Sequence, residues 1–236
     1  MGRSKRSKTE TNNIRKIVIS LIIVVITFLI GYVTTQYQDE IDKIFTSIYP
    51  MQLHTSNIDL NSIPEYNDTP YVELNGNIPY FTEEEKQRTD AFEEYSELDS
   101  LGRCGVAYAN ICRKLMPASG ETRGEISSIY PSGWKNKPYK GMVEGDYLYN
   151  RCHLIGWQLA AENANEKNLI TGTRYLNVQG MLPYENMVTT YLKERGNKNN
   201  HVLYRVTPIY EDKNLVPSGV EMEAYSVEDN RKRNLF

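Results

Sequence analysis

The sequence predicts an α+β domain built around a central antiparallel sheet and preceded by an N-terminal transmembrane helix. Three observations support this fold class: an uncharged apolar run at 17–33, strand-like alternation at 201–210 with a second strand at 215–225, and apolar residues at helical spacing within 183–195. A hydrophobic content of 40% and 18 tyrosines in 236 residues exclude a wholly disordered chain.

The N-terminal segment has the pattern of a signal anchor. Residues 1–16 carry six basic side chains and one acidic side chain, and residues 17–33 carry no charge. This run is at the short end of what spans a bilayer, and no small-x-small cleavage site follows it. We therefore predict a basic cytoplasmic tail at 1–16 and a single-pass transmembrane anchor at 17–33, with the rest of the chain extracellular. Cleavage of the anchor would instead release a secreted form.

The chain after the anchor divides into a tether and one folded domain. Residues 34–70 lack a core-sized set of apolar side chains and are predicted to be a polar tether, so the domain is expected to start near Tyr71 and to occupy 71–236. Charge is uneven: residues 39–99 carry fifteen acidic and three basic side chains, whereas 103–174 carry ten basic and six acidic. A polyanion would be held by the middle of the chain, although composition alone does not indicate nucleic acid.

Local patterns predict the elements of the domain in order. They are a short acidic helix at 83–94 with Thr82 as its N-cap, a strand at 105–112, a basic loop at 117–138, a hairpin at 140–152 turning at 144–146, a helix at 183–195 with Pro183 in its first turn and Gly196 as its C-cap, and antiparallel strands at 201–210 and 215–225.

The three cysteines, Cys104, Cys112 and Cys152, are too few for a disulfide framework. Cys104 and Cys112 could pair across a hairpin, but two buried thiols are the favoured interpretation. A zinc site that joins these thiols to His153 is disfavoured, because no Cys-x-x-Cys spacing is present.

His153 is the first candidate for chemistry, because a neutral imidazole is the usual general base near pH 7. A hydrogen-bonded structural histidine is the alternative. Arg151 alternates with His153 on the expected strand, so both side chains point to one face, and a guanidinium there suits a phosphate group. The Asn-rich tract that follows offers oxygen ligands for a hard divalent cation, with Asn177 and then Glu185 as the best candidates. The alternative is that these asparagines only form loops and turns.

A family resemblance favours the catalytic interpretation. Asn150-Arg151-Cys152-His153 resembles the Asp-Arg-Gly-His signature of the DNA/RNA non-specific endonucleases, in the branch often called DNA-entry nucleases. Further blocks resemble the same branch within about 71–225, namely Gly133-Trp134, 147–156, 168–177 and 181–186. The resemblance implies a ββα-metal active site.

The resemblance also implies roles for individual residues. His153 becomes the general base, Asn177 the protein ligand of one Mg²⁺, with Mn²⁺ as a substitute, and Asn168 and Glu185 supporting catalytic residues. Arg151 becomes a catalytic phosphate or leaving-group contact, and Arg123, which no motif fixes, a second substrate-binding arginine. Two departures from the signature are Asn150 in place of Asp and Cys152 in place of Gly. Relatives also continue into another strand after Tyr225, so we expect a shortened C-terminus.

These expectations describe an extracellular, membrane-anchored endonuclease that hydrolyses DNA without sequence preference, in DNA uptake or degradation. RNA stays open as a substrate, because no residue in the sequence is identified as a contact that distinguishes the 2′-hydroxyl of RNA. Protein partners are unknown. One alternative is a catalytically inactive surface protein that binds nucleic acid through the same scaffold. Another is a hydrolase that uses Ser132 or Cys152, but Cys152 and His153 are adjacent on a strand and point to opposite faces.

Overall fold

The computed structural model describes residues 63–228, together with Lys16, 18–20, Thr27 and Phe236. Among these residues, none of the helices combines the length and the apolar character that a bilayer crossing requires. Most of the predicted anchor at 17–33 lies outside the described residues, as do nearly all of 1–16 and most of 34–70. The anchor, the tether and the domain boundaries therefore stay predictions.

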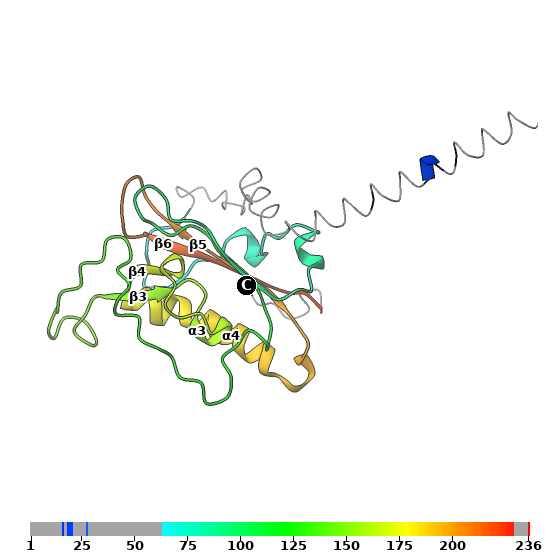
Figure 1. The fold of residues 1–236 in the computed structure, drawn as a ribbon. Coiled ribbons are helices and arrows are strands. Elements are labelled where there is room, and N and C mark those ends of the chain that lie inside the picture. The colour runs from blue at the N-terminus through cyan, green and yellow to red at the C-terminus, as the bar shows by residue number, and fades with distance from the viewer. Residues whose placement is uncertain (1–15, 17, 21–26, 28–62, 229–235) are drawn as a thin grey trace, which may run out of the picture. The chain divides into compact units, whose positions relative to one another are not determined.

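One layer of the domain is an antiparallel sheet with the strand order β1-β2-β5-β6 (Figure 1). The strands are β1 (Phe92–Tyr95), β2 (Ala107–Ile111), β5 (Val202–Ile209) and β6 (Gly219–Ser226). The longest pairing is that of β5 with β6, in which Val202 lies opposite Ser226 and Ile209 opposite Gly219. The predicted central antiparallel sheet is confirmed.

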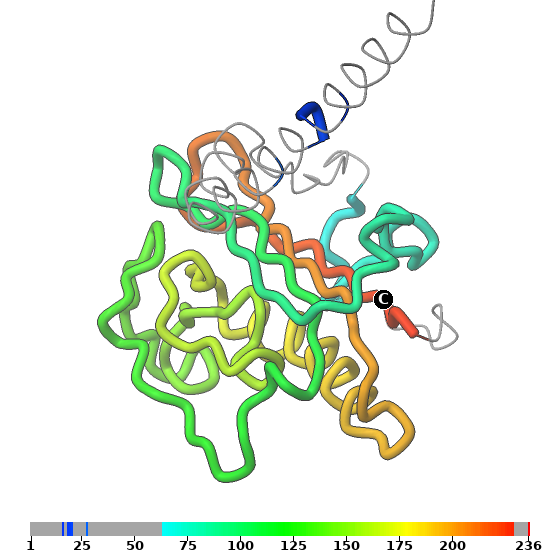
Figure 2. The backbone as a smooth tube through the Cα atoms, turned by 45° about the vertical axis from the view of Figure 1, so that its right-hand side comes forward, coloured from blue at the N-terminus to red at the C-terminus, as the bar shows by residue number. Residues whose placement is uncertain are grey.

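The second layer contains a two-stranded antiparallel ribbon and two helices. The ribbon pairs β3 (Tyr149–His153) with β4 (Leu169–Thr173), and the helices are α3 (Trp157–Ala160) and α4 (Leu182–Lys193). Figure 1 shows the ribbon, α3 and α4 on the same side of the four-stranded sheet. The long connection between β2 and β3, in green in Figure 2, runs around the outside of this layer.

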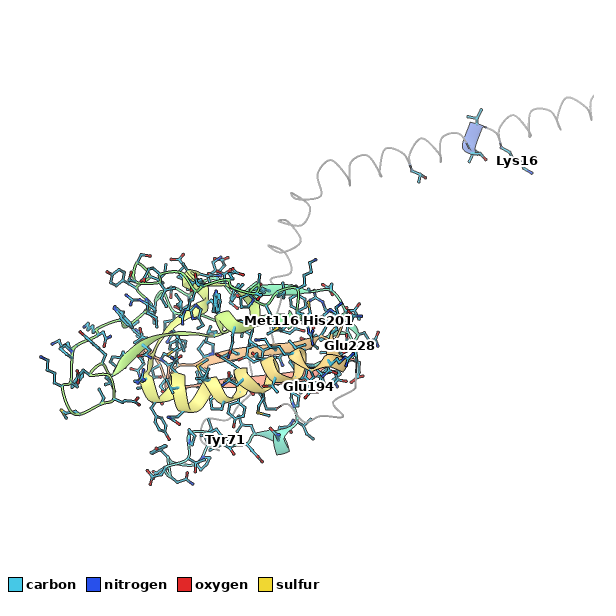
Figure 3. All side chains as sticks on the ribbon, turned by 90° about the horizontal axis from the view of Figure 1, so that it is seen from below. Lys16, Tyr71, Met116, Glu194, His201 and Glu228 are labelled. Atoms are coloured by element: carbon cyan, nitrogen blue, oxygen red, sulfur yellow. The ribbon has the colours of Figure 1, made fainter. Side chains whose placement is uncertain are left out.

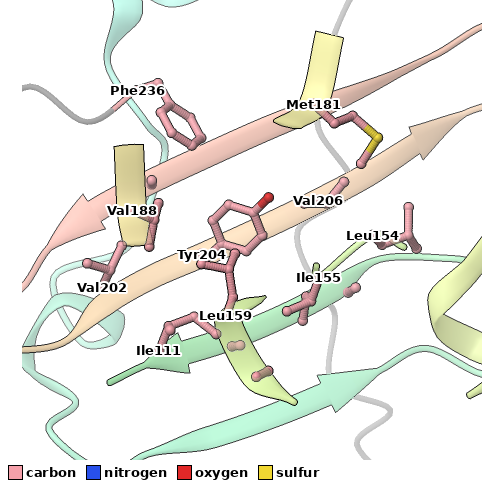
Figure 4. Close-up of a cluster of buried hydrophobic side chains, with 14 of the residues drawn as sticks. Ile111, Leu154, Ile155, Leu159, Met181, Val188, Val202, Tyr204, Val206 and Phe236 are labelled. Carbon is pink, nitrogen blue, oxygen red and sulfur yellow. The ribbon is translucent and has the colours of Figure 1, made fainter. Parts of the chain in front are cut away.

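The larger hydrophobic core lies between the two layers. Alternate residues of β2 and β5 point into it, including Ala109, Ile111 and Tyr204, because side chains of a strand alternate between faces. Leu154, Ile155, Leu159 and Val188 close it from the second layer, and Phe236 packs against it (Figure 4). This core fixes the ribbon and α4 in place relative to the sheet.

A smaller core covers the opposite face of the sheet, where Phe81 packs with Tyr108, Leu203 and Tyr225. Arg205 is buried beside it: its Nε donates to Glu223 Oε2 at 2.8 Å, and its guanidinium lies over the Phe81 ring. At the end of the β5–β6 pair, His201 and Glu228 are joined by a 2.6 Å contact between Nδ1 and Oε1 (Figure 3). Both faces of the sheet are therefore covered.

The predicted helix at 83–94 is wrong beyond its first turn. The N-cap of the helical turn is Glu84 and not Thr82. Thr82 and Glu85 nevertheless exchange the two bonds of a capping box: Glu85 N donates to Thr82 Oγ1 at 3.1 Å and Thr82 N donates to Glu85 Oε2 at 2.6 Å. The helical turn nevertheless ends at Gln87. Asn110 Nδ2 donates to the carbonyls of Arg88 and Asp90, at 3.0 and 2.8 Å. These carbonyls are thereby satisfied outside a helix, and the chain continues as β1.

The predicted hairpin at 140–152 is wrong in its pairing. Gly141, Gly145 and Asp146 adopt positive φ angles, so 140–146 forms turns, and only one isolated bridge joins Pro138 to Tyr147. The strand that follows pairs instead with the apolar β4. Helix α4 agrees with the predicted helix at 183–195, but Glu194 rather than Gly196 is its C-cap.

Candidate active site

The β3–β4 ribbon presents His153 at the edge of the core. His153 lies opposite Leu169 and Arg151 opposite Thr171, while the intervening Cys152 points into the core and is fully buried. Because strand side chains alternate, Arg151 and His153 share the other face of β3, as the sequence predicted. The ribbon therefore directs an arginine and a histidine to one side of the molecule.

The contacts of His153 fix its tautomer. Only 6% of the residue is exposed, and its Nε2 lies 2.8 Å from the backbone carbonyl of Asn163. A carbonyl can only accept, so Nε2 carries the hydrogen. Nδ1 lies 3.0 Å from Nη2 of Arg123, which can only donate. His153 is thus a neutral imidazole whose Nδ1 is the basic atom.

The pKa of His153 is lowered to about 4, because burial penalises the imidazolium and the nearby charge of Arg123 adds to the effect. The carbonyl of Asn163 opposes this shift by accepting the Nε2 hydrogen. The ring is therefore unprotonated throughout the neutral range, which is the state that a general base requires.

Arg123 links the residues of the site. Its side chain is exposed, and its Nε donates to Asn163 Oδ1 at 3.3 Å while Nη2 reaches His153. Its positive charge lowers the pKa of both His153 and Glu185. The guanidinium therefore contacts the imidazole directly and acts on the Glu185 carboxyl group through its charge.

Glu185 lies in the first turn of α4 with only 9% of the residue exposed. Burial raises its pKa to about 7, and the hydrogen bond from Gln158 Nε2 to Oε2, at 3.2 Å, together with Arg123 offsets part of this shift. The carboxyl group packs against Gly156: a Cβ on that glycine would lie 2.5 Å from Oε2. Gly156 and Gln158 thus set the position of the Glu185 carboxyl group.

Asn177 lies on a π-helical turn, Leu176–Met181, that continues directly into α4. Its side chain is half-buried, and its amide makes no hydrogen bond to any residue that the structure describes. Single π-helical turns of this kind often occur at functional sites. One continuous helical segment therefore carries both predicted oxygen donors, Asn177 and Glu185.

Two predicted site residues, Asn168 and Arg151, make structural hydrogen bonds. Asn168 is fully buried, and its side chain bonds the backbone of Ile155 twice, accepting from N at 2.8 Å and donating to O at 3.0 Å. Arg151 donates from Nε to Ile129 O at 2.5 Å and from Nη2 to Ser127 O at 2.9 Å. These contacts hold the turn after β3 and the loop before it.

Three residues of the site were not identified from the sequence: Asn163, Gln158 and Gly156. Asn163 contacts His153 mainly through its backbone carbonyl, which no side-chain pattern reveals. Gln158 and Gly156 act on Glu185 only because α3 and α4 pack together. Their spacing from Glu185 in the sequence carries no signal of this contact.

The oxygen donors fit a hard divalent cation. No group of three or more His, Cys, Asp or Glu side chains that could hold a metal occurs among the described residues. A cation such as Mg²⁺ that keeps several waters needs only one or two protein ligands. Glu185 Oε1 and the Asn177 amide oxygen accept no hydrogen bond from the described part of the chain, so both are available as ligands.

The comparisons with known proteins identify the family of the chain. Residues 82–228 match the model of the DNA/RNA non-specific endonuclease family. The chain belongs to this family. It is therefore a nuclease, and the family resemblance seen in the sequence is confirmed.

Solved structures of other nucleases share the fold. NucA from Streptococcus agalactiae with a magnesium ion bound is 24% identical, with a TM-score of 0.52 over 61% of this chain and 68% of that one. Sda1 nuclease with a bound zinc ion is 31% identical, with a TM-score of 0.50 over 59% of this chain and 70% of that one. The comparison with curated proteins found no match.

Proposed function

We propose that the chain is a divalent-metal-dependent endonuclease that hydrolyses phosphodiester bonds of DNA without sequence preference, with His153 as its general base and with RNA left open as a further substrate. The observation that carries the proposal is the neutral His153, whose basic atom Nδ1 contacts the Arg123 guanidinium and whose Nε2 is held by the Asn163 carbonyl. The metal is magnesium by preference, with manganese as a substitute; the zinc and magnesium ions of the two neighbours support only a divalent ion.

Each residue has a distinct task in the proposed reaction. Nδ1 of His153 accepts a proton from a water molecule, whose oxygen attacks the phosphorus in line while the bond to the 3′ oxygen breaks. Nε2 stays bound to Asn163 O and keeps the ring oriented. Arg123 moves from the imidazole to the phosphate, where its fork matches two oxygens. The products are a 5′-phosphate and a 3′-hydroxyl, which takes its proton from solvent.

Asn177 and Glu185 would hold the cation, Asn177 directly and Glu185 directly or through a bound water. When bound, the cation supplies positive charge that stabilises the phosphate oxygens as negative charge develops. Gln158 and Gly156 keep the Glu185 carboxyl group in place for this role. Asn168 supports the site indirectly, because its two hydrogen bonds fix the turn that follows His153.

The predicted anchor at 17–33 places this activity at the outer surface of the cell membrane, and DNA uptake or degradation is the role that we propose there. The family membership supports a nucleic-acid substrate. The membrane location rests on the sequence pattern alone.

The first prediction concerns catalysis by the full-length chain on supercoiled plasmid. His153→Ala should lower cleavage by about 10²-fold or more, because a general base contributes 10²- to 10⁴-fold. His201→Ala is the matched control, since His201 bonds Glu228 at the far end of the β5–β6 pair, outside the site. EDTA should stop the wild-type reaction and magnesium should restore it.

Two outcomes would contradict the proposal: wild-type cleavage by His153→Ala with an unchanged melting temperature, or full cleavage in EDTA.

A second candidate function is a catalytically inactive nucleic-acid-binding surface protein. The position of Arg123, 3.0 Å from the basic nitrogen, is the observation that favours it. The absence of cleavage by the wild-type chain at any divalent-metal concentration, together with retained binding, would support that candidate.

A further inference from the structure

A short loop beside the site combines aromatic and basic side chains. We call residues 130–140 the lysine–aromatic loop. It has no acidic residue, and its three rings and three lysines are Tyr130, Trp134, Tyr139, Lys135, Lys137 and Lys140. The exposed fractions of Tyr130 and Tyr139 are 74% and 40%, and all three lysines are exposed. The proposed reaction does not use these side chains.

The loop is anchored from two sides. On one side, Arg151 bonds the carbonyls of Ser127 and Ile129, and its guanidinium lies 4.1 Å from the centroid of the Trp134 ring and 5.5 Å from that of Tyr130. Two of the guanidinium nitrogens are thereby engaged. Arg151 therefore holds the rings in place through a stacking contact, and its predicted contact with phosphate stays a prediction.

On the other side, the loop packs against 215–216. Ser132 Oγ donates to Leu215 O at 2.6 Å. Gly133 has a φ of +68°, and a Cβ there would lie 2.6 Å from Val216 Cγ2, so only glycine permits this approach. Tyr130 is therefore an exposed ring held on a fixed support, which costs little entropy when a ligand stacks on it.

The anchored rings border the catalytic base. Arg151 and His153 share one face of β3 and are two residues apart, which is about 7 Å along a strand. A nucleic-acid strand with its scissile phosphate at His153 would therefore pass beside Tyr130 and Trp134 with its neighbouring nucleotide.

We propose that the lysine–aromatic loop is a stacking platform for the unpaired bases of single-stranded nucleic acid next to the scissile phosphate. This inference rests on the proposed function. Exposed rings stack on the faces of unpaired bases, and lysines between them contact the phosphates. Bases inside a duplex already stack on their neighbours, so the loop would favour single strands, or unpaired segments, over fully paired DNA.

Other occupants fit the loop less well. A second copy of the chain would bring three lysines against three lysines, which is unfavourable in a self-complementary contact. The loop also lacks Leu, Ile and Phe, and its Trp134 ring, which could insert into lipid, is instead in contact with the Arg151 guanidinium.

The test measures binding in EDTA, by fluorescence anisotropy of the full-length chain with a labelled oligothymidylate and with a labelled blunt-ended duplex that has no unpaired bases. Tyr130→Ala should weaken oligothymidylate binding by about ten-fold, because one base–aromatic stack has an effect of this order. Tyr130→Phe, which keeps the ring, should bind within about two-fold of wild type. Binding of the duplex by Tyr130→Ala should change by less than about two-fold, since no paired base leaves its stack.

Tyr80→Ala is the matched control. Tyr80 is also well exposed, at 62%, but it belongs to the segment that covers the opposite face of the sheet, where Arg205 donates to its carbonyl. This variant should leave binding of both ligands unchanged. The assay requires neither metal nor cleavage, so its outcome is separate from that of the plasmid assay on His153→Ala.

Four outcomes would overturn the platform. They are unchanged oligothymidylate binding by Tyr130→Ala, an equal loss of duplex binding, no binding of either ligand by the wild type, and a Tyr130-dependent self-association or vesicle binding in place of nucleic-acid binding. If His153→Ala still cleaves plasmid while Tyr130→Ala loses oligothymidylate binding, the assignment of the base is wrong and the platform stands.

Discussion

His153 is held by two neighbours of opposite character, a carbonyl acceptor at Nε2 and a guanidinium donor at Nδ1. Together they select the neutral form of the ring. The sequence singles out His153 as the candidate base, because it lies in a family motif on an alternating strand. It did not reveal the backbone carbonyl of Asn163 or the place of Arg123 beside the ring, since both contacts depend on how two loops fold over β3.

The neutral state of His153 predicts a pH-dependent stability. Its pKa is lowered in the folded chain to about 4 from an ordinary 6.5, so the unfolded chain takes up a proton first as the pH falls. The free energy of unfolding should therefore decrease between pH 6.5 and pH 4, by at most roughly 3 kcal/mol, and this contribution should be constant above pH 6.5.

Urea unfolding at several pH values in EDTA, for the wild type and His153→Gln, isolates this contribution. Glutamine can donate to Asn163 O and accept from Arg123 without titrating. The wild type should lose more stability than the variant between pH 7 and pH 4.5. Parallel pH profiles for the two chains would show that His153 titrates normally in the folded state.

At the scale of elements, the site depends on the approach of α3 to α4. The start of α3 carries Gly156 and Gln158, and both touch the Glu185 carboxyl group on the first turn of α4. Gly156 has an ordinary φ of −61°, so glycine is needed here for space and not for backbone conformation. A methyl group at this position would displace the carboxyl group.

Gly156→Ala should therefore lower plasmid cleavage by about 10²-fold, since small misplacements of site groups have effects of this size. The free energy of unfolding should fall by only about 1–3 kcal/mol, as in other overpacked sites. Gly219→Ala on β6 is the matched control, because a Cβ there has no atom within 4 Å. Equal cleavage by the two variants would show that the position of Glu185 has no effect on catalysis.

Element predictions succeeded where local pattern dominates. Helix α4 and strands β2, β5 and β6 follow from apolar periodicity and turn residues within each segment. The failures depend on partners that are distant in the sequence. Asn110, on the strand next to β1, donates to the carbonyls of Arg88 and Asp90. Strand β3 pairs with β4, beyond the Asn-rich loop, and not with the turns that precede it. No local pattern contains that information.

At the scale of the whole domain, a buried ion pair joins the segment around Tyr80 and Phe81, which we call the outer segment, to the four-stranded sheet. Glu223 accepts from Arg205 Nε and from Tyr80 N, at 2.8 and 2.6 Å, and the Arg205 side chain is only 2% exposed. Loss of the Glu223 carboxylate would leave the buried guanidinium of Arg205 without its main partner. The outer segment thus depends on this pair as well as on apolar packing around Phe81.

Glu223→Ala should lower the free energy of unfolding by up to about 3–5 kcal/mol, the usual effect of breaking a buried ion pair, because Arg205 then keeps the longer contact with Glu85, at 3.4 Å, as its only ion pair among the described residues. Glu83→Ala removes one partner of an exposed ion pair with Lys86 and should cost less than about 1 kcal/mol. Urea unfolding of both variants measures the contrast. Equal destabilisation would show that Arg205 finds another partner or solvent when Glu223 is absent.

The three cysteines also have a consequence for the molecule as a whole. All of them are buried and unpaired, and burial raises the pKa of Cys104 and Cys152 to about 12, so these two thiols carry almost no thiolate at neutral pH. The fold contains no disulfide that must form and no exposed thiol that could be oxidised. Its folded state is therefore independent of the redox poise of the surroundings, and the same domain can form in a reducing cytoplasm or in an oxidising exterior.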